Sequence, residues 1–201
     1  MAPQTDFSKF KFGPVIDFPE TYEVYDFSQS YDSERMRNGE YGIGRYNEKR
    51  PGMYSTELFT LNSAARDIHI GIDLAAPVGV PVYAFYEGRI FQTAVNPAAG
   101  DYGGTVITEH DLDGRTLWAL YGHLSHSSVT AKKAGDRLHR GDVVGWLGDK
   151  NENGDWNPHL HFQLSWKEPE LCDMPGAVNE RDLADALLSY PDPRLVLGPI
   201  Y

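Results

Sequence analysis

The chain has almost no cysteine, no excess of basic residues and no long apolar run, and each absence excludes a class of protein. Cys172 is the only cysteine among 201 residues, so the chain cannot form a disulfide framework of its own. Lysine and arginine number 18 against 29 acidic residues, a formal net charge of −11, which argues against a nucleic-acid-binding surface. No segment approaches the roughly 18–20 consecutive apolar residues of a membrane-spanning helix.

The N-terminal residues also lack the apolar segment that a secretory signal requires. Cys172 lies between acidic neighbours, which disfavour a thiolate, so we interpret it as structural rather than nucleophilic. A chain with one such cysteine is compatible with a reducing compartment. We therefore expect a cytoplasmic protein that binds neither nucleic acid nor membrane.

Abundant glycine, proline and tyrosine, at 20, 13 and 12 residues, favour strands and turns over helices. Short alternating segments separated by turn signals begin at Asp67 and predict an antiparallel β-sandwich or open barrel. Asp111–Gly114 is a hairpin turn signal, and Gly88 is predicted to form a bulge or bend. The expected strands cover residues 68–74, 81–93, 104–110, 115–123 and 158–166.

The pattern divides the chain into three parts. Residues 1–40 are polar and aromatic without periodicity, which predicts an irregular arm pinned by its aromatic side chains. Residues 41–168 form the β domain, and residues 169–201 hold one short helix followed by an extended tail. We expect that helix over Asn179–Leu188, with Asn179 as its N-cap.

Chemistry-bearing side chains recur on one face of three predicted strands. His159 and His161 are two residues apart and therefore co-facial, as are His69 and Asp73 with Gly71 between them. His123 lies near the end of a third strand. Taken alone, each segment is consistent with solvated histidines or a surface salt bridge.

Taken together, the three segments predict a metal site. His69, Asp73 and one of His159 and His161 make a two-histidine, one-carboxylate set, the pattern of a catalytic zinc with an open position for water. His123 and the remaining histidine of the pair would then be free for proton transfer and charge stabilisation.

Other candidates rank lower. The segment Asp149–Gly154 imitates the start of a calcium loop but lacks the acidic twelfth position, so we predict a turn-rich loop. His110, His126 and His139 do not align with the ligand faces and are predicted to be solvated.

In order and spacing, the three motifs resemble the lysostaphin/LytM family of zinc metallopeptidases. The motifs are His69-Ile-Gly-Ile-Asp73, Tyr121-Gly-His123-Leu and His159-Leu-His161-Phe. The resemblance implies His69, Asp73 and His161 as ligands of one Zn²⁺ ion, with His123 and His159 as the catalytic pair. It also implies an antiparallel β-sandwich with the site in a groove, acting as an endopeptidase on a peptide or peptide-like substrate.

A narrower resemblance concerns residues 149–163 and 189–198, which look like the peptidase-like module of some kinase/peptidase/aminotransferase multidomain proteins. Two other functions therefore stay open. The first is a non-catalytic metal- or ligand-binding, regulatory module on the same fold, and the second is a hydrolase of non-peptide amides or esters. The arm could also cover the site, with Asp32 or Asn38 supplying a fourth ligand.

Overall fold

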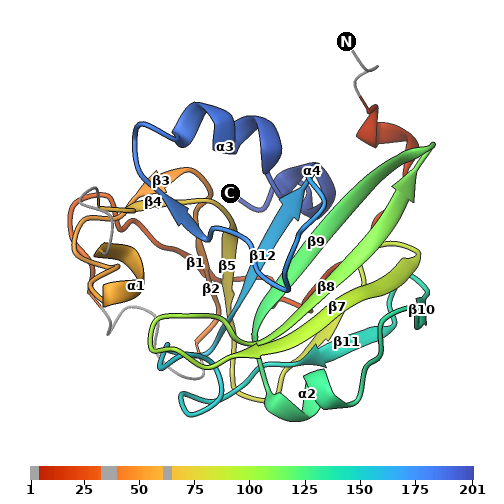
Figure 1. Ribbon diagram of the computed structural model, residues 1–201, viewed down its shortest axis with the longest axis horizontal. Helices are drawn as coiled ribbons and strands as arrows, with labels where there is room; N and C mark the ends of the chain where they lie inside the picture. Colours follow the sequence, from red (N-terminus) through yellow and green to blue (C-terminus); the bar gives the residue numbers. More distant parts are fainter. Residues whose placement is uncertain (1–4, 33–39, 61–64) are drawn as a thin grey trace.

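The centre of the protein is a sheet that contains eight strands within the part of the chain that the computed structural model describes, residues 5–32, 40–60 and 65–201 (Figure 1). Its strands follow the spatial order β1-β2-β5-β12-β9-β8-β7-β10. In that order they are β1 (Glu23–Val24), β2 (Gly42–Gly44), β5 (Ile72–Ala75), β12 (His159–Ser165), β9 (Arg115–Leu124), β8 (Gly103–Leu112), β7 (Gly88–Asn96) and β10 (Arg137–Leu138).

Two smaller sheets complete the β structure of these residues. One pairs β6 (Pro81–Tyr83) with β11 (Val143–Trp146), and the other has the order β13 (Ala177–Val178), β4 (Ile68–His69), β3 (Glu48–Lys49). The helices are η1 (Phe7–Lys9), α1 (Glu57–Thr60), α2 (His126–Thr130), α3 (Leu183–Ser189) and α4 (Arg194–Leu197). None of the helices in the described residues has the length and apolar character needed to cross a bilayer.

Strand pairing in the three sheets is antiparallel except between β1 and β2. The prediction of a mainly β, antiparallel fold with a short helix near the C-terminus is therefore confirmed. The exception arises in the N-terminal arm, which adds β1 to the edge of the large sheet instead of remaining wholly irregular. Its aromatic side chains do pin it, since Tyr25 and Phe27 are buried.

Alternation along β12 places one face of the strand in the main core. Leu160, Phe162 and Leu164 are fully buried there among side chains from β5, β8 and β9. Burying such a side chain contributes on the order of 1.5–3 kcal/mol. The opposite face, with His159 and His161, is thereby fixed in position against the rest of the site.

The hairpin between β8 and β9 also forms where it was predicted. Asp113 and Gly114 both have positive φ, 54° and 84°, as a two-residue type I′ turn requires. The Asp111 carboxylate accepts the Gly114 N–H at 2.6 Å and closes the turn.

The predicted strand over residues 68–74 is wrong, because it is two short strands in different sheets. His69 in β4 pairs with Glu48 and Ala177, whereas Asp73 in β5 pairs with His161. Between them Ile70 donates its N–H to the Gly176 carbonyl, so the chain crosses from one sheet to the other.

The role expected of Gly88 is also wrong. Gly88 begins β7, and the irregular register lies further along, between Ile90 and Gln92. A Cβ on Gly88 would lie 2.3 Å from the Glu109 carbonyl oxygen, so the residue is needed for close strand approach rather than for a bend.

The C-terminal part differs from the prediction in two details. Helix α3 begins at Leu183 with Asp182 as its N-cap, while the Asn179 side chain accepts the Asp182 N–H at 3.0 Å in the preceding turn. The tail is not wholly extended, because Pro193 precedes the four-residue helix α4.

Candidate metal and catalytic centre

Strand register brings the predicted ligands together. Asp73 in β5 is directly opposite His161 in β12 and Gly44 in β2. His69 reaches the same point from β4 in the neighbouring sheet, just before the crossing at Gly71. A Cβ on Gly71 would lie 2.4 Å from His161 Cε1, so only glycine leaves room for that ring.

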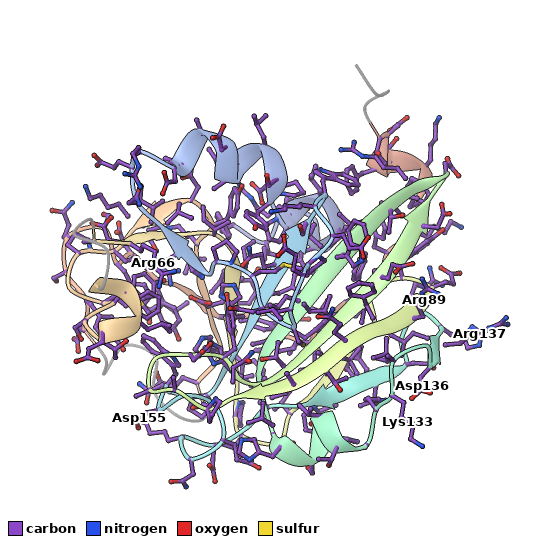
Figure 2. The ribbon with its side chains drawn as sticks, viewed as in Figure 1. Arg66, Arg89, Lys133, Asp136, Arg137 and Asp155 are labelled. Carbon is purple, nitrogen blue, oxygen red and sulfur yellow. The ribbon has the colours of Figure 1, made fainter. Side chains whose placement is uncertain are left out.

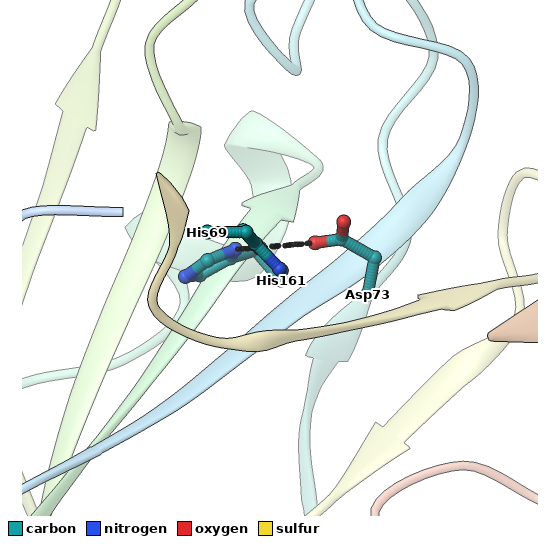
Figure 3. A group of neighbouring side chains, drawn as sticks. All are labelled: His69, Asp73 and His161. Carbon is teal, nitrogen blue, oxygen red and sulfur yellow. Dashed lines mark hydrogen bonds and ion pairs between the residues drawn. The ribbon is translucent and has the colours of Figure 1, made fainter. Parts of the chain in front are cut away.

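The three side chains present one ligand atom each to a common point (Figure 3). His69 Nε2 lies 3.0 Å from His161 Nδ1 and 3.1 Å from Asp73 Oδ1, and His161 Nδ1 lies 3.2 Å from Asp73 Oδ1. All three residues are buried, at 2–3% exposure. The ligand atoms thus form a nearly equilateral triangle.

The hydrogen bonds on the far side of each ring assign the tautomers. His69 Nδ1 faces the Arg45 carbonyl oxygen at 2.9 Å, which can only accept, so Nδ1 carries the proton and Nε2 a lone pair. His161 Nε2 faces Gln163 Oε1 at 3.0 Å, which leaves the lone pair on His161 Nδ1. The Gln163 amide nitrogen donates to the Pro175 carbonyl at 3.4 Å, which fixes the amide orientation.

Two imidazole lone pairs and a carboxylate oxygen therefore converge at a buried point, where they repel one another unless a cation lies among them. Tetrahedral zinc with ligand bonds of about 2.0–2.1 Å separates its ligand atoms by about 3.3 Å. The observed edges of 3.0–3.2 Å fit that requirement. The donor set and its outer hydrogen bonds therefore fit a zinc ion.

The charge states of the predicted ligands suit metal binding. Burial, followed by the nearby Arg50 charge, lowers the pKa of His69 to about 4, so its ring is neutral at pH 7. Burial alone would raise the pKa of Asp73, but His69 and Arg50 bring it well below its usual range. The Arg50 guanidinium donates to Asp73 Oδ2 at 2.6 Å, on the side away from the histidines.

His123 is aimed at the site by a bulge at the end of β9. Its φ of 64° is unusual for a residue other than glycine, and it falls where the register between β8 and β9 shifts. Its Nδ1–H donates to the Asn153 carbonyl at 2.8 Å, so Nε2 is left unprotonated. Such strained backbone near a buried polar side chain is typical of functional sites.

His159 is the second histidine beside the ligand triangle. Its Nδ1–H donates to the Asn157 carbonyl at 2.7 Å, and its Nε2 lies 3.7 Å from Asp73 Oδ1. The rings of His159 and His123 have centroids 4.3 Å apart. Burial lowers the pKa of both histidines, that of His123 to well below its usual value, so both are neutral at pH 7.

The histidines and Asp73 line a cavity of ≈ 90 Å³. Tyr54, Phe59 and Trp156 give it an aromatic wall, and the charged residue Arg66, beside α1 in Figure 2, also lines it. The side chains that remain in the lining are mostly polar or small. The arrangement offers three candidate metal ligands and two neutral histidines in one cavity.

The structure brings together His69, Asp73, His123, His159 and His161, all five residues predicted from the sequence. Their individual roles stay predictions.

His110 lies apart from the site and is buried rather than solvated, with its ring nitrogens 2.7 Å from Thr108 Oγ1 and 2.9 Å from the Glu87 carbonyl. Burial raises the pKa of the Cys172 thiol to about 12, consistent with an unreactive role. Asp32 is exposed and does not line the cavity, and Asn38 lies outside the described residues.

Three residues around the site were missed by the sequence reasoning. Gln163 had a signal, since it shares the face of His159 and His161 on the same strand. Arg50 and Asn153 had none, because neither belongs to an alternating pattern that includes the histidines. Only the folded chain shows that they hold Asp73 and His123.

The fold and the site together define a mainly β protein in which two histidines and one carboxylate converge, the donor set that catalytic zinc hydrolases use. A comparison with sequence models of protein families identifies the family within this class. The chain belongs to peptidase family M23, whose model matches residues 67–172. Membership of this family supports a hydrolase of the metallo-endopeptidase type, and the predicted resemblance to the lysostaphin family is confirmed.

Individual relatives match about half of the chain. The chain is 38% identical over 96 residues to peptidoglycan DD-endopeptidase ShyA of Vibrio cholerae. That alignment covers 48% of this chain and 20% of ShyA. It is also 38% identical over 96 residues to glycyl-glycine endopeptidase ALE-1 of Staphylococcus capitis, in an alignment that covers 47% of this chain and 24% of ALE-1. The chain therefore spans about a quarter or less of the length of these curated relatives.

Among solved structures, the catalytic domain of the M23 protein EnpA from Enterococcus faecalis aligns with a TM-score of 0.46 and 28% identity. The alignment covers 69% of this chain and 88% of that one.

Proposed function

We propose that the chain is a zinc-dependent endopeptidase that hydrolyses a peptide amide bond. His69, Asp73 and His161 would hold the metal, and His123 and His159 would act as the catalytic pair. The observation that carries the proposal is the convergence of two imidazole lone pairs and one carboxylate oxygen at 3.0–3.2 Å, beside two further neutral histidines. Family membership supports it.

When bound, zinc would supply a Lewis acid that polarises a carbonyl and brings the pKa of water to about 7. The protein's own residues do the rest. His69 and His161 keep their lone pairs on the site because the Arg45 carbonyl and Gln163 hold the protons on their far nitrogens.

His123 and His159 provide the proton chemistry. Each has its Nδ1–H fixed on a backbone carbonyl, so each presents an unprotonated Nε2 toward the substrate position. Their rings are too close to carry two charges, so the pair takes up one proton from the attacking water. The ring that holds that proton has an Nε2–H donor, which stabilises charge on the former carbonyl oxygen and then passes the proton to the leaving amine.

The names of the relatives suggest which peptides to test first. ShyA is a peptidoglycan DD-endopeptidase and ALE-1 a glycyl-glycine endopeptidase. We infer a peptide substrate of the peptidoglycan type, with cross-linked stem peptides and pentaglycine as the first assay compounds.

The test is hydrolysis of these peptides by zinc-loaded protein, followed by mass spectrometry. Replacing His123 or His159 with Ala should reduce the rate about 10²–10⁴-fold while zinc remains bound. His126→Ala, three residues past His123, is the matched control and should keep full activity. Equal hydrolysis by the wild type and both variants would refute the proposal.

Two other outcomes would point to the alternative functions. Zinc bound without hydrolysis of any peptide favours a non-catalytic, ligand-binding module, and hydrolysis of esters or non-peptide amides alone favours a different substrate class. The likeness to a module of kinase/peptidase/aminotransferase proteins and the cytoplasmic location stay predictions.

A further inference from the structure

Arg50 is a charged residue that the fold encloses completely. It follows β3 directly and has 0% exposed surface, although arginine is almost never buried unless it is paired. Enclosing a guanidinium is costly, and it is compensated only by good geometry and by partners for most of its N–H groups. The partners of Arg50 therefore show what the burial achieves.

Every nitrogen of the guanidinium has a partner. Nε donates to Glu48 Oε2 at 3.0 Å, and Nη2 donates to the Arg45 carbonyl at 3.2 Å. Nη1 donates to Asp73 Oδ2 at 2.6 Å and to the Tyr54 hydroxyl at 3.3 Å. The shortest of these contacts is the one to the predicted metal ligand.

Because of this contact, the two oxygens of the Asp73 carboxylate have different partners. Oδ1 lies 3.1 Å from His69 Nε2 and 3.2 Å from His161 Nδ1, whereas Oδ2 is taken by Arg50. Gly44 makes the division sterically feasible. A Cβ at Gly44 would lie 2.8 Å from Arg50 Nη2 and 2.9 Å from Asp73 Oδ2, and would push the pair apart.

Glu48 accepts a hydrogen bond from Arg50 on the side of the guanidinium away from Asp73, and it has further partners that do not depend on Arg50. Its Oε1 accepts from Arg45 Nε at 2.9 Å and from the Phe27 N–H at 3.2 Å. Arg45 in turn pairs with Asp26 at 2.8 Å. The network thus runs from the N-terminal arm to the ligand triangle, and Glu48 keeps partners when Arg50 is removed.

We propose that Arg50 is a positioning residue for the metal site, which holds Asp73 in the orientation where only Oδ1 faces the two histidines. Glu48 acts through Arg50 by fixing the guanidinium. The inference rests on the proposed zinc site but adds a residue outside the three ligands. A merely structural ion pair makes a different prediction, namely lower stability with unchanged metal affinity.

The test measures zinc affinity by competition with a chromogenic chelator, together with thermal unfolding of the metal-free protein. Arg50→Met should weaken zinc binding about 10–100-fold, the usual effect of losing an outer partner of a ligand. Arg50→Lys keeps the charge but cannot bridge Glu48 and Asp73, so its loss should be smaller. Glu48→Gln should weaken zinc binding in the wild type and add nothing in the Arg50→Met background.

A second readout uses Co²⁺ in place of zinc. With Oδ2 released, Asp73 can turn both oxygens to the metal, and the higher coordination number weakens the visible absorption band. Arg50→Met should show that weaker band, and Arg50→Lys should recover part of it. Arg89→Met is the matched control, because Arg89 forms an exposed pair with Glu109 at 2.8 Å at the surface in Figure 2.

Three results overturn the inference while leaving the proposed function intact. They are a folded Arg50→Met variant with zinc affinity within about twofold of the wild type, an unchanged Co²⁺ band, and an effect of Glu48→Gln that persists without Arg50. If Arg50→Met fails to fold, Arg50→Lys and Glu48→Gln decide the question by the same criterion. A wild-type protein that binds no zinc would instead refute the proposed function itself.

Discussion

Gly71→Ala adds a single methyl group at the point where the chain passes closest to a predicted zinc ligand. The new Cβ would lie 2.4 Å from His161 Cε1 and 2.5 Å from His161 Nε2, closer than such carbon contacts allow. Gly71 is not among the residues with positive φ, so alanine is compatible with its backbone and the clash is with the ring alone. Restoring an ordinary contact of about 3.5 Å requires the ring to move by about 1 Å.

A displacement of that size exceeds the tolerance of a zinc site, whose ligand distances hold within about 0.2 Å. We therefore expect zinc affinity to fall at least about 10–100-fold, and the overpacked metal-free protein to lose about 1–3 kcal/mol of stability. Competition with a chelator measures the first quantity and urea unfolding measures the second.

Gly13→Ala is the control, since its Cβ would lie 3.1 Å from Arg140 Cγ, in a flexible side chain that does not line the site. A folded Gly71→Ala protein that binds zinc as tightly as the wild type would refute the geometry described for His161.

Two further predictions concern His110 and Asn153. Burial lowers the pKa of His110 to about 4, against about 6.5 when unfolded, so its contribution to stability is complete above pH 6.5 and is lost as the pH falls toward 4. The difference between these two pKa values corresponds to about 3 kcal/mol of stability. Urea unfolding of the wild type and His110→Gln between pH 7.5 and 4.5 should show a shallower pH dependence of stability in the variant. Equal slopes in the two proteins would contradict the reasoning. Asn153→Ala removes the side chain that bonds Trp156 N at 3.0 Å and Trp156 O at 2.9 Å, so the carbonyl that orients His123 is released. Peptide hydrolysis should fall about 10–100-fold with zinc affinity unchanged, and a parallel loss of zinc would show instead that the loop supports the metal site.

Local periodicity was enough to predict the composition of the site. Alternation along residues 158–166 places His159 and His161 on one face and Leu160 and Phe162 in the core, and the structure has this arrangement. The hairpin at Asp113 and Gly114 was likewise readable, because positive φ at both positions follows from the residue types. Such features depend on bonds and neighbours within a few residues.

Periodicity failed where the chain leaves one sheet for another. Residues 68–74 alternate as one strand would, yet Ile70 bonds to Gly176, more than one hundred residues away in the sequence. His69 and Asp73 consequently face each other across a bend instead of lying along one strand. A partner so distant leaves no trace in the local pattern.

The sequence by itself determined which residue types could form a metal site and that His159 and His161 share a strand face, because side-chain direction within a strand follows from backbone geometry. Only the tertiary structure decided that His161 and not His159 is opposite Asp73, since strand register is a property of two strands together. The tertiary structure also decided that Arg50 is buried between Glu48 and Asp73, because the burial of a charge depends on partners that the whole fold brings together.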